Sequence, residues 1–193
     1  MTGRIIEAEA DVKEGAAYLC GICPRLKEAY AQTGDLPLRR TEDGFERLLS
    51  AIVSQQVSVA SANAIWTRLK AAGLSEPKAV LAASEESLRA EGLSRQKARY
   101  ARALAEAEID YHALRSAPDD AVIATLTQVP GIGVWTAEIY AMFSLGRADV
   151  FAPGDLALQE AARLLYDLPE RPKERAFRQM ACLLYTSDAA DEY

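Results

Sequence analysis

Apolar residues recur every three to four positions along most of this chain, which is the spacing of amphipathic helices. The clearest run lies between positions 45 and 53, where the apolar side chains share one face: Phe45, Leu48, Leu49, Ile52 and Val53. Thr41 is placed to cap the start of that helix. The sequence has neither a run of alternating β-branched residues nor an Asn-Gly hairpin signal. We therefore predict an all-α fold of packed short helices.

Capping residues and glycines indicate where the other helices begin and end. Gly92 and Gly146 stand at helix ends, and Asp119 and Asp120 lie in a first turn, where the helix dipole favours acidic residues. The 193 residues make one domain or two small lobes that share a core, and we take 1–181 as one helical domain. The helices expected after the first one cover about 57–69, 77–83, 84–91, 95–108, 118–128, 133–145 and a stretch from Asp155.

Composition excludes several classes of protein. Half of the residues are hydrophobic and 26% are charged, which excludes disorder. No apolar run approaches the roughly 20 residues of a membrane span, and the N-terminus lacks a signal-peptide core. With three cysteines and no export signal, we expect a cytoplasmic, bacterial-type protein without a membrane partner. The net charge of −6 argues against a uniformly basic nucleic-acid binder, but it leaves room for a local DNA-binding face.

The end of the sequence differs from the rest. From residue 182 onward it resembles the translation of a transposase sequencing-library adapter, so we expect 182–193 to be a non-native tail and the natural sequence to be cut near Ala181. A natural acidic tail is the alternative. The tail holds Asp188, Asp191 and Glu192 and no Lys or Arg, so the net charge without it is −3 instead of −6.

The most informative segment is 126–136, Leu-Thr-Gln-Val-Pro-Gly-Ile-Gly-Val-Trp-Thr. Gly131 and Gly133 flank Ile132 between two helical segments, so we expect a tight turn with positive φ at the glycines. The amides of Gly133, Val134 and Trp135 would lie unpaired at a helix N-terminus, which is an anion site suited to a phosphate. Such a turn can grip a phosphodiester without a lysine. A plain helix–helix turn is the alternative.

Four segments together resemble one family. Residues 129–137 read Val-Pro-Gly-Ile-Gly-Val-Trp-Thr-Ala, and residues 149–155 read Asp-Val-Phe-Ala-Pro-Gly-Asp. Upstream, residues 51–60 read Ala-Ile-Val-Ser-Gln-Gln-Val-Ser-Val-Ala, and residues 92–98 read Gly-Leu-Ser-Arg-Gln-Lys-Ala. They look like the hairpin, the following aspartate loop, the glutamine-bearing segment and a further segment of the DNA-3-methyladenine glycosylase II family. This family belongs to the helix-hairpin-helix DNA glycosylases.

The resemblance covers about residues 35–181 and places the helix-hairpin-helix at about 118–145. It implies two helical lobes flanking a cleft. It also implies a monomer that hydrolyses the N-glycosidic bond of alkylated purines in double-stranded DNA during base-excision repair. Without its natural end, the chain would lack helical sequence that the family has near its base pocket.

Asp155 is the candidate catalytic residue. Breaking an N-glycosidic bond builds positive charge on the sugar, which a fixed carboxylate can stabilise while it orients the attacking water. A helix start favours the charged form of Asp155, but a capping aspartate with no other role is the bland alternative. Since a base alkylated at a ring nitrogen leaves readily, a strong general acid is not required. His112, the only histidine, is expected to be structural or exposed.

Two aromatic residues follow the hairpin. Trp135 stands where bifunctional relatives carry a lysine nucleophile, which implies a monofunctional enzyme without lyase activity. A cationic base favours an aromatic wall, and Trp135 is the better candidate for it. Tyr140 is a second base-pocket candidate whose alternative is a core position, and Trp66 is expected in the core.

The resemblance also assigns DNA contacts. Gln55 and Gln56 would lie at the helix end that inserts into the duplex, with Gln56 filling the gap left by the flipped nucleotide. An exposed pair of amides is the alternative. The remaining contacts with DNA would come from Ser58, Lys97, Gly131, Gly133, Val134 and Thr136.

No cofactor is expected, but the family's hairpin holds a monovalent cation through backbone carbonyls, here those of Thr127, Val129 and Ile132. The pair Cys20 and Cys23 has CxxC spacing without a second pair in the natural sequence, so we interpret it as ordinary buried thiols. Two rivals to the glycosylase reading stay open: a non-catalytic helix-hairpin-helix DNA-binding module, and an inactive truncated glycosylase.

Overall fold

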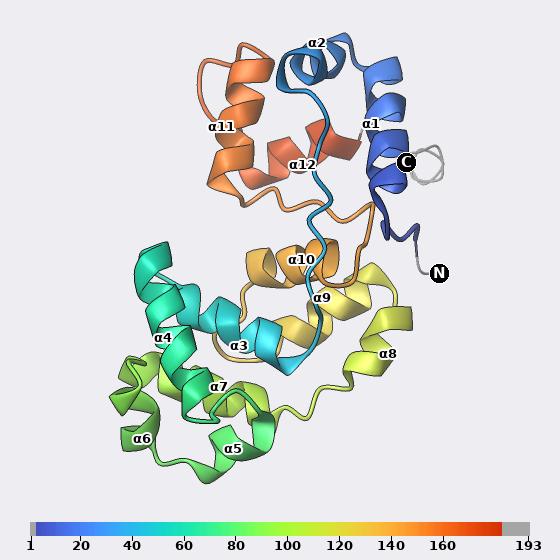
Figure 1. The fold of residues 1–193 in the computed structure, drawn as a ribbon. Coiled ribbons are helices and arrows are strands. Elements are labelled where there is room, and N and C mark those ends of the chain that lie inside the picture. The colour runs from blue at the N-terminus through green and yellow to red at the C-terminus, as the bar shows by residue number, and fades with distance from the viewer. Residues whose placement is uncertain (1–2, 183–193) are drawn as a thin grey trace. The chain divides into compact units, whose positions relative to one another are not determined.

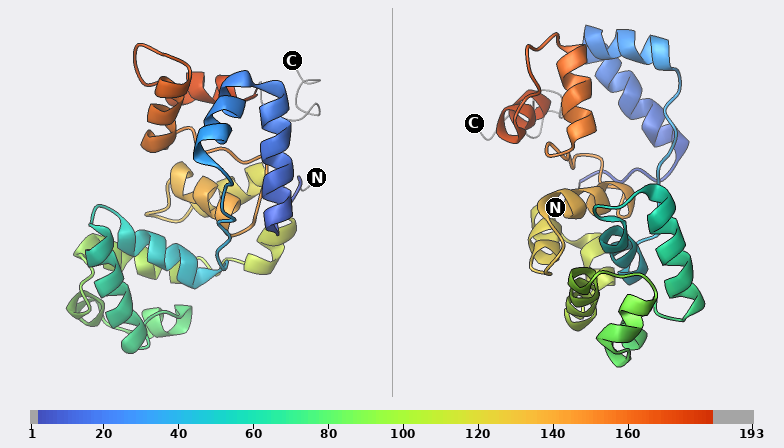
Figure 2. Two further views of the ribbon diagram at one scale, coloured as in Figure 1. Left: turned by 45° about the horizontal axis from the view of Figure 1, so that its top comes forward. Right: turned by 90° about the vertical axis from the view of Figure 1, so that its left-hand side faces the viewer.

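The computed structural model describes residues 3–182, which form two compact units (Figure 1, Figure 2). The first unit comprises 41–145, and the second comprises 3–40 together with 146–182. Within the described residues there are twelve helices and no β-sheet, so the predicted all-α fold is confirmed. The predicted tail lies outside the described residues, except for the backbone of Cys182.

The first unit is built around α3 (Phe45–Ser54), whose five predicted apolar residues are all buried. Helix α7 (Arg95–Glu106) packs on α3, and its Ala98 and Ala101 are fully buried. The other helices of this unit are α4 (Val59–Ala71), α5 (Pro77–Ala82), α6 (Glu85–Ala90), α8 (Tyr111–Ser116), α9 (Asp119–Thr127) and α10 (Val134–Phe143).

Helix boundaries in this unit mostly follow the capping signals. Ser84 and Ser94 cap α6 and α7 through their hydroxyls, and Gly92 has the positive φ of a residue just beyond a helix end. The predicted cap at Thr41 is wrong, since Gly44 occupies that position. The Thr41 hydroxyl instead lies 3.0 Å from that of Ser144.

Helix α4 begins at Val59, two residues later than the predicted start at 57. The reason is that Ser58 caps it, its hydroxyl accepting from the amide of Ser61 at 3.2 Å. Leu69 of this helix is fully buried. Trp66, which was expected in the core, is only half-buried, and the Lys70 ammonium lies 5.8 Å from its ring centroid.

The second unit contains α1 (Glu9–Ile22), α2 (Pro24–Thr33), α11 (Leu156–Leu165) and α12 (Glu174–Cys182). Cys23 joins α1 to α2 and is buried, with its Sγ 3.6 Å from the Tyr166 hydroxyl, whereas Cys20 is half-buried. Phe151 meets Phe177 edge to face at 4.8 Å, which ties the loop before α11 to α12. Neither described cysteine is in a disulfide, as expected for ordinary thiols.

Across residues 3–182, no helix is long and apolar enough to cross a membrane. The same residues include no group of three or more His, Cys, Asp or Glu side chains that could hold a metal ion.

Tyr140 is a core residue, which corrects its expected place in a base pocket. Only 2% of it is exposed, and its hydroxyl accepts from the backbone amide of Gly44 at 2.8 Å. Burial raises the pKa of Tyr140 to about 12. The ring therefore has no face to offer a ligand, and its hydroxyl positions the start of α3.

We expect the Tyr140→Phe substitution to lower the free energy of unfolding by about 1–3 kcal/mol, because it leaves the Gly44 amide without its acceptor. Urea unfolding measures the change. Tyr18→Phe is the control, because Tyr18 is exposed, and it should change stability by less than about 0.5 kcal/mol. A Tyr140→Phe protein as stable as wild type would contradict the core assignment.

Candidate functional site

The predicted hairpin joins α9 to α10 and requires glycine at position 131 for two reasons. Gly131 has a φ of +93°, which side-chain-bearing residues rarely adopt. A Cβ built on it would come within 2.4 Å of the ring of Tyr100, which belongs to α7. A side chain at position 131 would therefore displace either the Tyr100 ring or the backbone of the turn.

Gly133 differs from Gly131, and its predicted positive φ is wrong. Its φ is −87° and its ψ is 170°, an extended conformation that any residue can adopt. A Cβ at Gly133 would meet no atom of the described protein within 4 Å. Neither strain nor internal packing therefore requires a glycine here, although glycine suits the N-cap position and leaves room for another molecule to approach the backbone.

The start of α10 has the geometry of an anion site. Gly133 is the N-cap and has no side chain to accept from the amides that follow, and the first intrahelical bond runs from Ala137 to the Gly133 carbonyl at 3.0 Å. Val134 is 54% exposed, whereas Thr136 is only 8% exposed. A contact between Thr136 and DNA would accordingly use its amide and not its hydroxyl.

The two glutamines lie in the turn between α3 and α4 but do different things. The Gln55 side chain donates from Nε2 to the Gly131 carbonyl at 2.8 Å, so it ties this turn to the hairpin. Gln56 is exposed and has a φ of +55°, which is uncommon for a residue with a side chain. The structure thus separates an anchor, Gln55, from a projecting residue, Gln56. The Ser58 hydroxyl is occupied in capping α4.

Lys97 and Tyr100 lie three residues apart on α7, close to both turns. The Lys97 ammonium donates to the carbonyl of Val53 in the last turn of α3 at 2.7 Å, and its burial lowers the pKa of Lys97. This contact is internal, which differs from the direct DNA contact that the resemblance implies. Sequence reasoning missed Tyr100. The available signal was its i+3 spacing from Lys97, which places both side chains on one helix face.

Asp155 belongs to the second unit, where it caps α11. Its Oδ1 accepts from the amides of Ala157 at 2.9 Å and Leu158 at 3.0 Å. The loop before it is held by buried Gln159, whose Nε2 donates to the Pro153 carbonyl at 2.7 Å. Asp155 is therefore a helix cap, and the same two bonds fix the orientation of its carboxylate.

Trp135 lies in the first turn of α10 and is 47% exposed, so part of the indole is accessible. His112 is exposed, within the range expected. The carbonyls predicted to hold a cation lie around the hairpin. That of Val129 accepts from the Ile132 amide at 3.0 Å, and the Thr127 hydroxyl donates to the Ile123 carbonyl at 2.8 Å.

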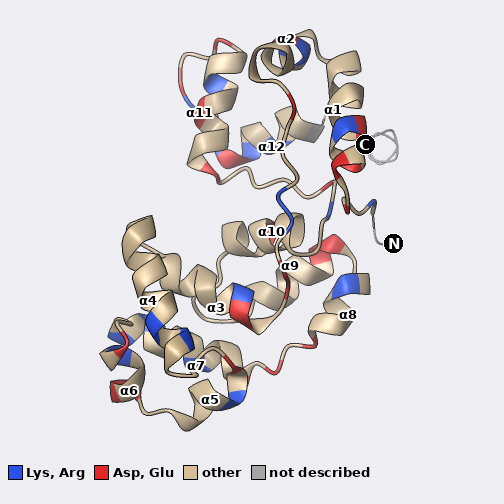
Figure 3. Cartoon of the chain, viewed as in Figure 1, with Lys and Arg blue, Asp and Glu red and all other residues tan. Residues whose placement is uncertain are grey.

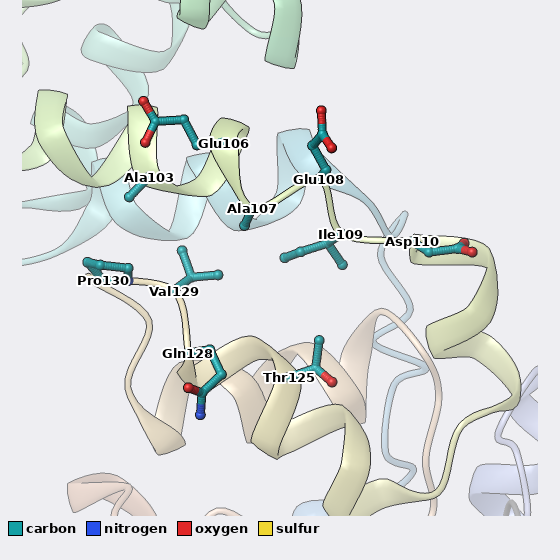
Figure 4. Close-up of a pocket in the computed structure, with 10 residues that line it drawn as sticks. All are labelled: Ala103, Glu106, Ala107, Glu108, Ile109, Asp110, Thr125, Gln128, Val129 and Pro130. Atoms are coloured by element: carbon teal, nitrogen blue, oxygen red, sulfur yellow. The ribbon is translucent and has the colours of Figure 1, made fainter.

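A cavity of about 650 Å³ lies behind the hairpin, between the end of α7 and the end of α9 (Figure 4). Val129, Pro130 and Ile109 face into it, while the carboxylates of Glu106 and Glu108 point away. Val129 is the only predicted site residue in its lining, so this cavity is not the predicted base pocket.

Charge in the first unit is unevenly distributed. Figure 3 shows Lys and Arg gathered on α4 to α7. Several are engaged within the unit: Arg68 bonds the Glu91 carbonyl, Lys70 pairs with Glu46 at 3.1 Å and Arg95 pairs with Glu85 at 3.5 Å. These helices supply local positive charge in a chain that is acidic as a whole.

The fold and the hairpin define a class of protein. Residues 49–183 match the HhH-GPD superfamily of base excision DNA repair proteins, and the chain belongs to that family.

Individual relatives carry related names. The chain is 29% identical over 178 residues to DNA-3-methyladenine glycosylase 1 of Schizosaccharomyces pombe, covering 86% of this chain and 78% of the relative. The solved structure of the S. pombe 3-methyladenine DNA glycosylase in complex with abasic DNA superposes with a TM-score of 0.77 at 29% identity, covering 92% of each chain. A DNA-3-methyladenine glycosidase from Bacillus halodurans superposes with a TM-score of 0.79 at 32% identity, covering 91% of this chain and 83% of that one.

The two hairpin glycines give a paired prediction. Gly131→Ala should lower the free energy of unfolding by about 1–3 kcal/mol or more, since strain and the clash with Tyr100 add. Gly133→Ala should cost only about 1 kcal/mol, as expected for alanine at an N-cap. It should nevertheless weaken binding to duplex DNA about tenfold, because the methyl group keeps a phosphate from the amides. Thermal unfolding and fluorescence anisotropy with a duplex oligonucleotide separate the two effects.

Wild-type affinity for DNA in a folded Gly133→Ala variant would contradict a phosphate contact at this helix start.

Proposed function

We propose that this protein is a monofunctional DNA glycosylase that removes alkylated purines, of the 3-methyladenine type, from double-stranded DNA. The supporting observation is the start of α10, where Gly133 is unexplained by the protein's own packing and precedes a helix start suited to a phosphate. The names of the relatives from S. pombe and B. halodurans support the class of damaged base.

In the proposed reaction, Asp155 acts on the sugar. Its Oδ1 is oriented by two backbone amides, and Oδ2 would face C1′ as the bond to the base breaks. There, negative charge would stabilise the developing oxocarbenium ion and orient the attacking water. An alkylated purine leaves as a neutral base, so the site needs no strong general acid.

The lesion would be exposed by turning the nucleotide out of the duplex, at a cost of a few kcal/mol. Gln56, which projects from the α3–α4 turn, would occupy the vacated space, and its amide could bond to the unpaired base opposite. The exposed part of the Trp135 indole would contact the cationic base, an attraction of about 0.5–2 kcal/mol.

We propose that the backbone carbonyls of Thr127, Val129 and Ile132, which belong to residues around the hairpin, would hold a monovalent cation. Such a cation would supply positive charge for a phosphate. No organic cofactor enters the proposal. We propose that the protein acts as a monomer in the compartment that holds the DNA, the bacterial cytoplasm and nucleoid.

One observation favours a second candidate, a non-catalytic DNA-binding module. Asp155 already has a structural task, because it caps α11, and a cap alone would explain an aspartate at this position. The two candidates differ in whether the charge of Asp155 matters.

Asp155→Asn separates these candidates, because asparagine caps a helix as well as aspartate does but carries no charge. We expect the variant to keep wild-type stability and to lose release of 3-methyladenine from methylated duplex DNA by at least about 100-fold. Chromatography of the released base measures the rate, and thermal unfolding serves as the control for folding.

Equal release by wild type and Asp155→Asn would remove the carboxylate from the mechanism. Absence of release by folded wild-type protein that still binds duplex DNA would favour the binding module. Failure of the wild type in both assays would favour an inactive chain.

Absence of lyase activity gives a further prediction. An indole has no amine that can form a Schiff base, so wild type should leave DNA strands intact after base release and form no borohydride-trapped adduct with abasic DNA. Trp135→Lys is the matched control, because it restores an amine at that position. Electrophoresis detects both products, and a trapped adduct with the wild type would show that the enzyme is bifunctional.

A further inference from the structure

Helix α7 contacts both turns that the proposed function assigns to DNA. Lys97 reaches the end of α3, immediately before the turn that carries Gln56, at 2.7 Å. Tyr100 lies against Gly131 so closely that no side chain fits at that position. Gln96 holds the Tyr100 hydroxyl from the same helix. One helix face therefore supports both the glutamine turn and the hairpin.

A second connection joins the two turns directly. The Gln55 side chain crosses from the end of α3 to the Gly131 carbonyl at 2.8 Å. Gln56, the next residue, is in the left-handed region with φ +55°, a conformation that is unfavourable for a residue with a side chain and persists only when its surroundings impose it.

The carbonyl of Val53 lies at the C-terminal end of α3, where a positively charged donor stabilises the helix. The last carbonyls of a helix lack intrahelical partners, and the negative end of the helix dipole lies there. The Lys97 ammonium satisfies one of these carbonyls and stabilises the end of α3 in the conformation from which Gln56 projects. Lys97 is half-buried and its ammonium already has a partner within the protein, which is consistent with an internal role.

We propose that Lys97 and Gln55 are positioning residues. They hold Gln56 in its projecting conformation at a fixed place relative to the hairpin, so that the insertion of Gln56 and the grip on the phosphate are set before DNA binds. This proposal rests on the proposed glycosylase function. It replaces the direct DNA contact implied for Lys97 with an indirect one that acts through Gln56.

The test uses Lys97→Met, which keeps the aliphatic stem but removes the donor. Arg99→Met is the matched control, since Arg99 lies on the same helix, is exposed and loses the same charge. Two duplexes carry one 7-methylguanine each. It is paired with cytosine in the first and lies opposite an abasic analogue in the second, where no base pair must be broken and no orphaned base remains.

On the paired duplex, Lys97→Met should lower the single-turnover rate of base release about 10- to 100-fold, as expected for a misplaced contact, while Arg99→Met should not. On the unpaired duplex the loss should be clearly smaller, because little help with flipping is needed. Adding Gln56→Ala to Lys97→Met should cost little more than either change alone, since the two residues act through one step.

Direct phosphate binding by Lys97 predicts the opposite results. Lys97→Met would then lose the same rate on both duplexes, weaken binding to undamaged DNA and reduce the salt slope by about one, and the double variant would be additive. Any of these outcomes overturns the proposal. If Lys97→Met does not fold, Gln55→Met removes the other connection and should show the same dependence on the duplex.

Hydrogen exchange of the DNA-free protein separates this proposal from the proposed function. Lys97→Met should accelerate exchange at the amides of 52–56 relative to Arg99→Met, because the end of α3 loses a partner. Unchanged exchange would overturn the positioning role even in an active enzyme. If Lys97→Met accelerates exchange but the wild-type protein releases no base, the positioning role stands and the glycosylase function is rejected.

Discussion

The hairpin of the first unit depends on the contact between Gly131 and Tyr100. The backbone at 131 has a φ that favours glycine, and the Tyr100 ring occupies the space where a Cβ would be. Because the ring belongs to α7, the hairpin is seated on a helix that also packs against α3. The conformation of the loop is therefore set by a core helix, as expected where a site must be held before its ligand arrives.

The acidic composition is compatible with DNA binding because the proposed grip uses backbone amides. A helix start contributes partial positive charge without adding a lysine or arginine, and a glycine N-cap leaves room for a phosphate to approach. The same principle operates in the second unit, where the amides of α11 hold the Asp155 carboxylate. One helix start thus serves the protein's own anion, and the other is proposed to serve the anion of the substrate.

Much of the fold could be predicted because local signals determine it. The apolar face of α3, the serine caps of α6 and α7 and the position of the hairpin follow from spacing and residue type. What escaped prediction depends on tertiary contacts. Gly133 looks like Gly131 in sequence, yet only Gly131 has a tyrosine ring above it. The sequence also could not show that the Lys97 ammonium lies 2.7 Å from the carbonyl of Val53. The burial of Tyr140 is likewise decided by the neighbours that surround it.

The most direct test of the account is a crystal structure of this protein bound to duplex DNA that carries a cationic pyrrolidine analogue of the reacting sugar. The account predicts a phosphate oxygen about 3 Å from the amides at the start of α10, the Gln56 side chain within the base stack, and the Asp155 carboxylate beside the analogue's charged nitrogen. A complex in which the phosphate lies away from Gly133, or in which another residue faces that nitrogen, would contradict it.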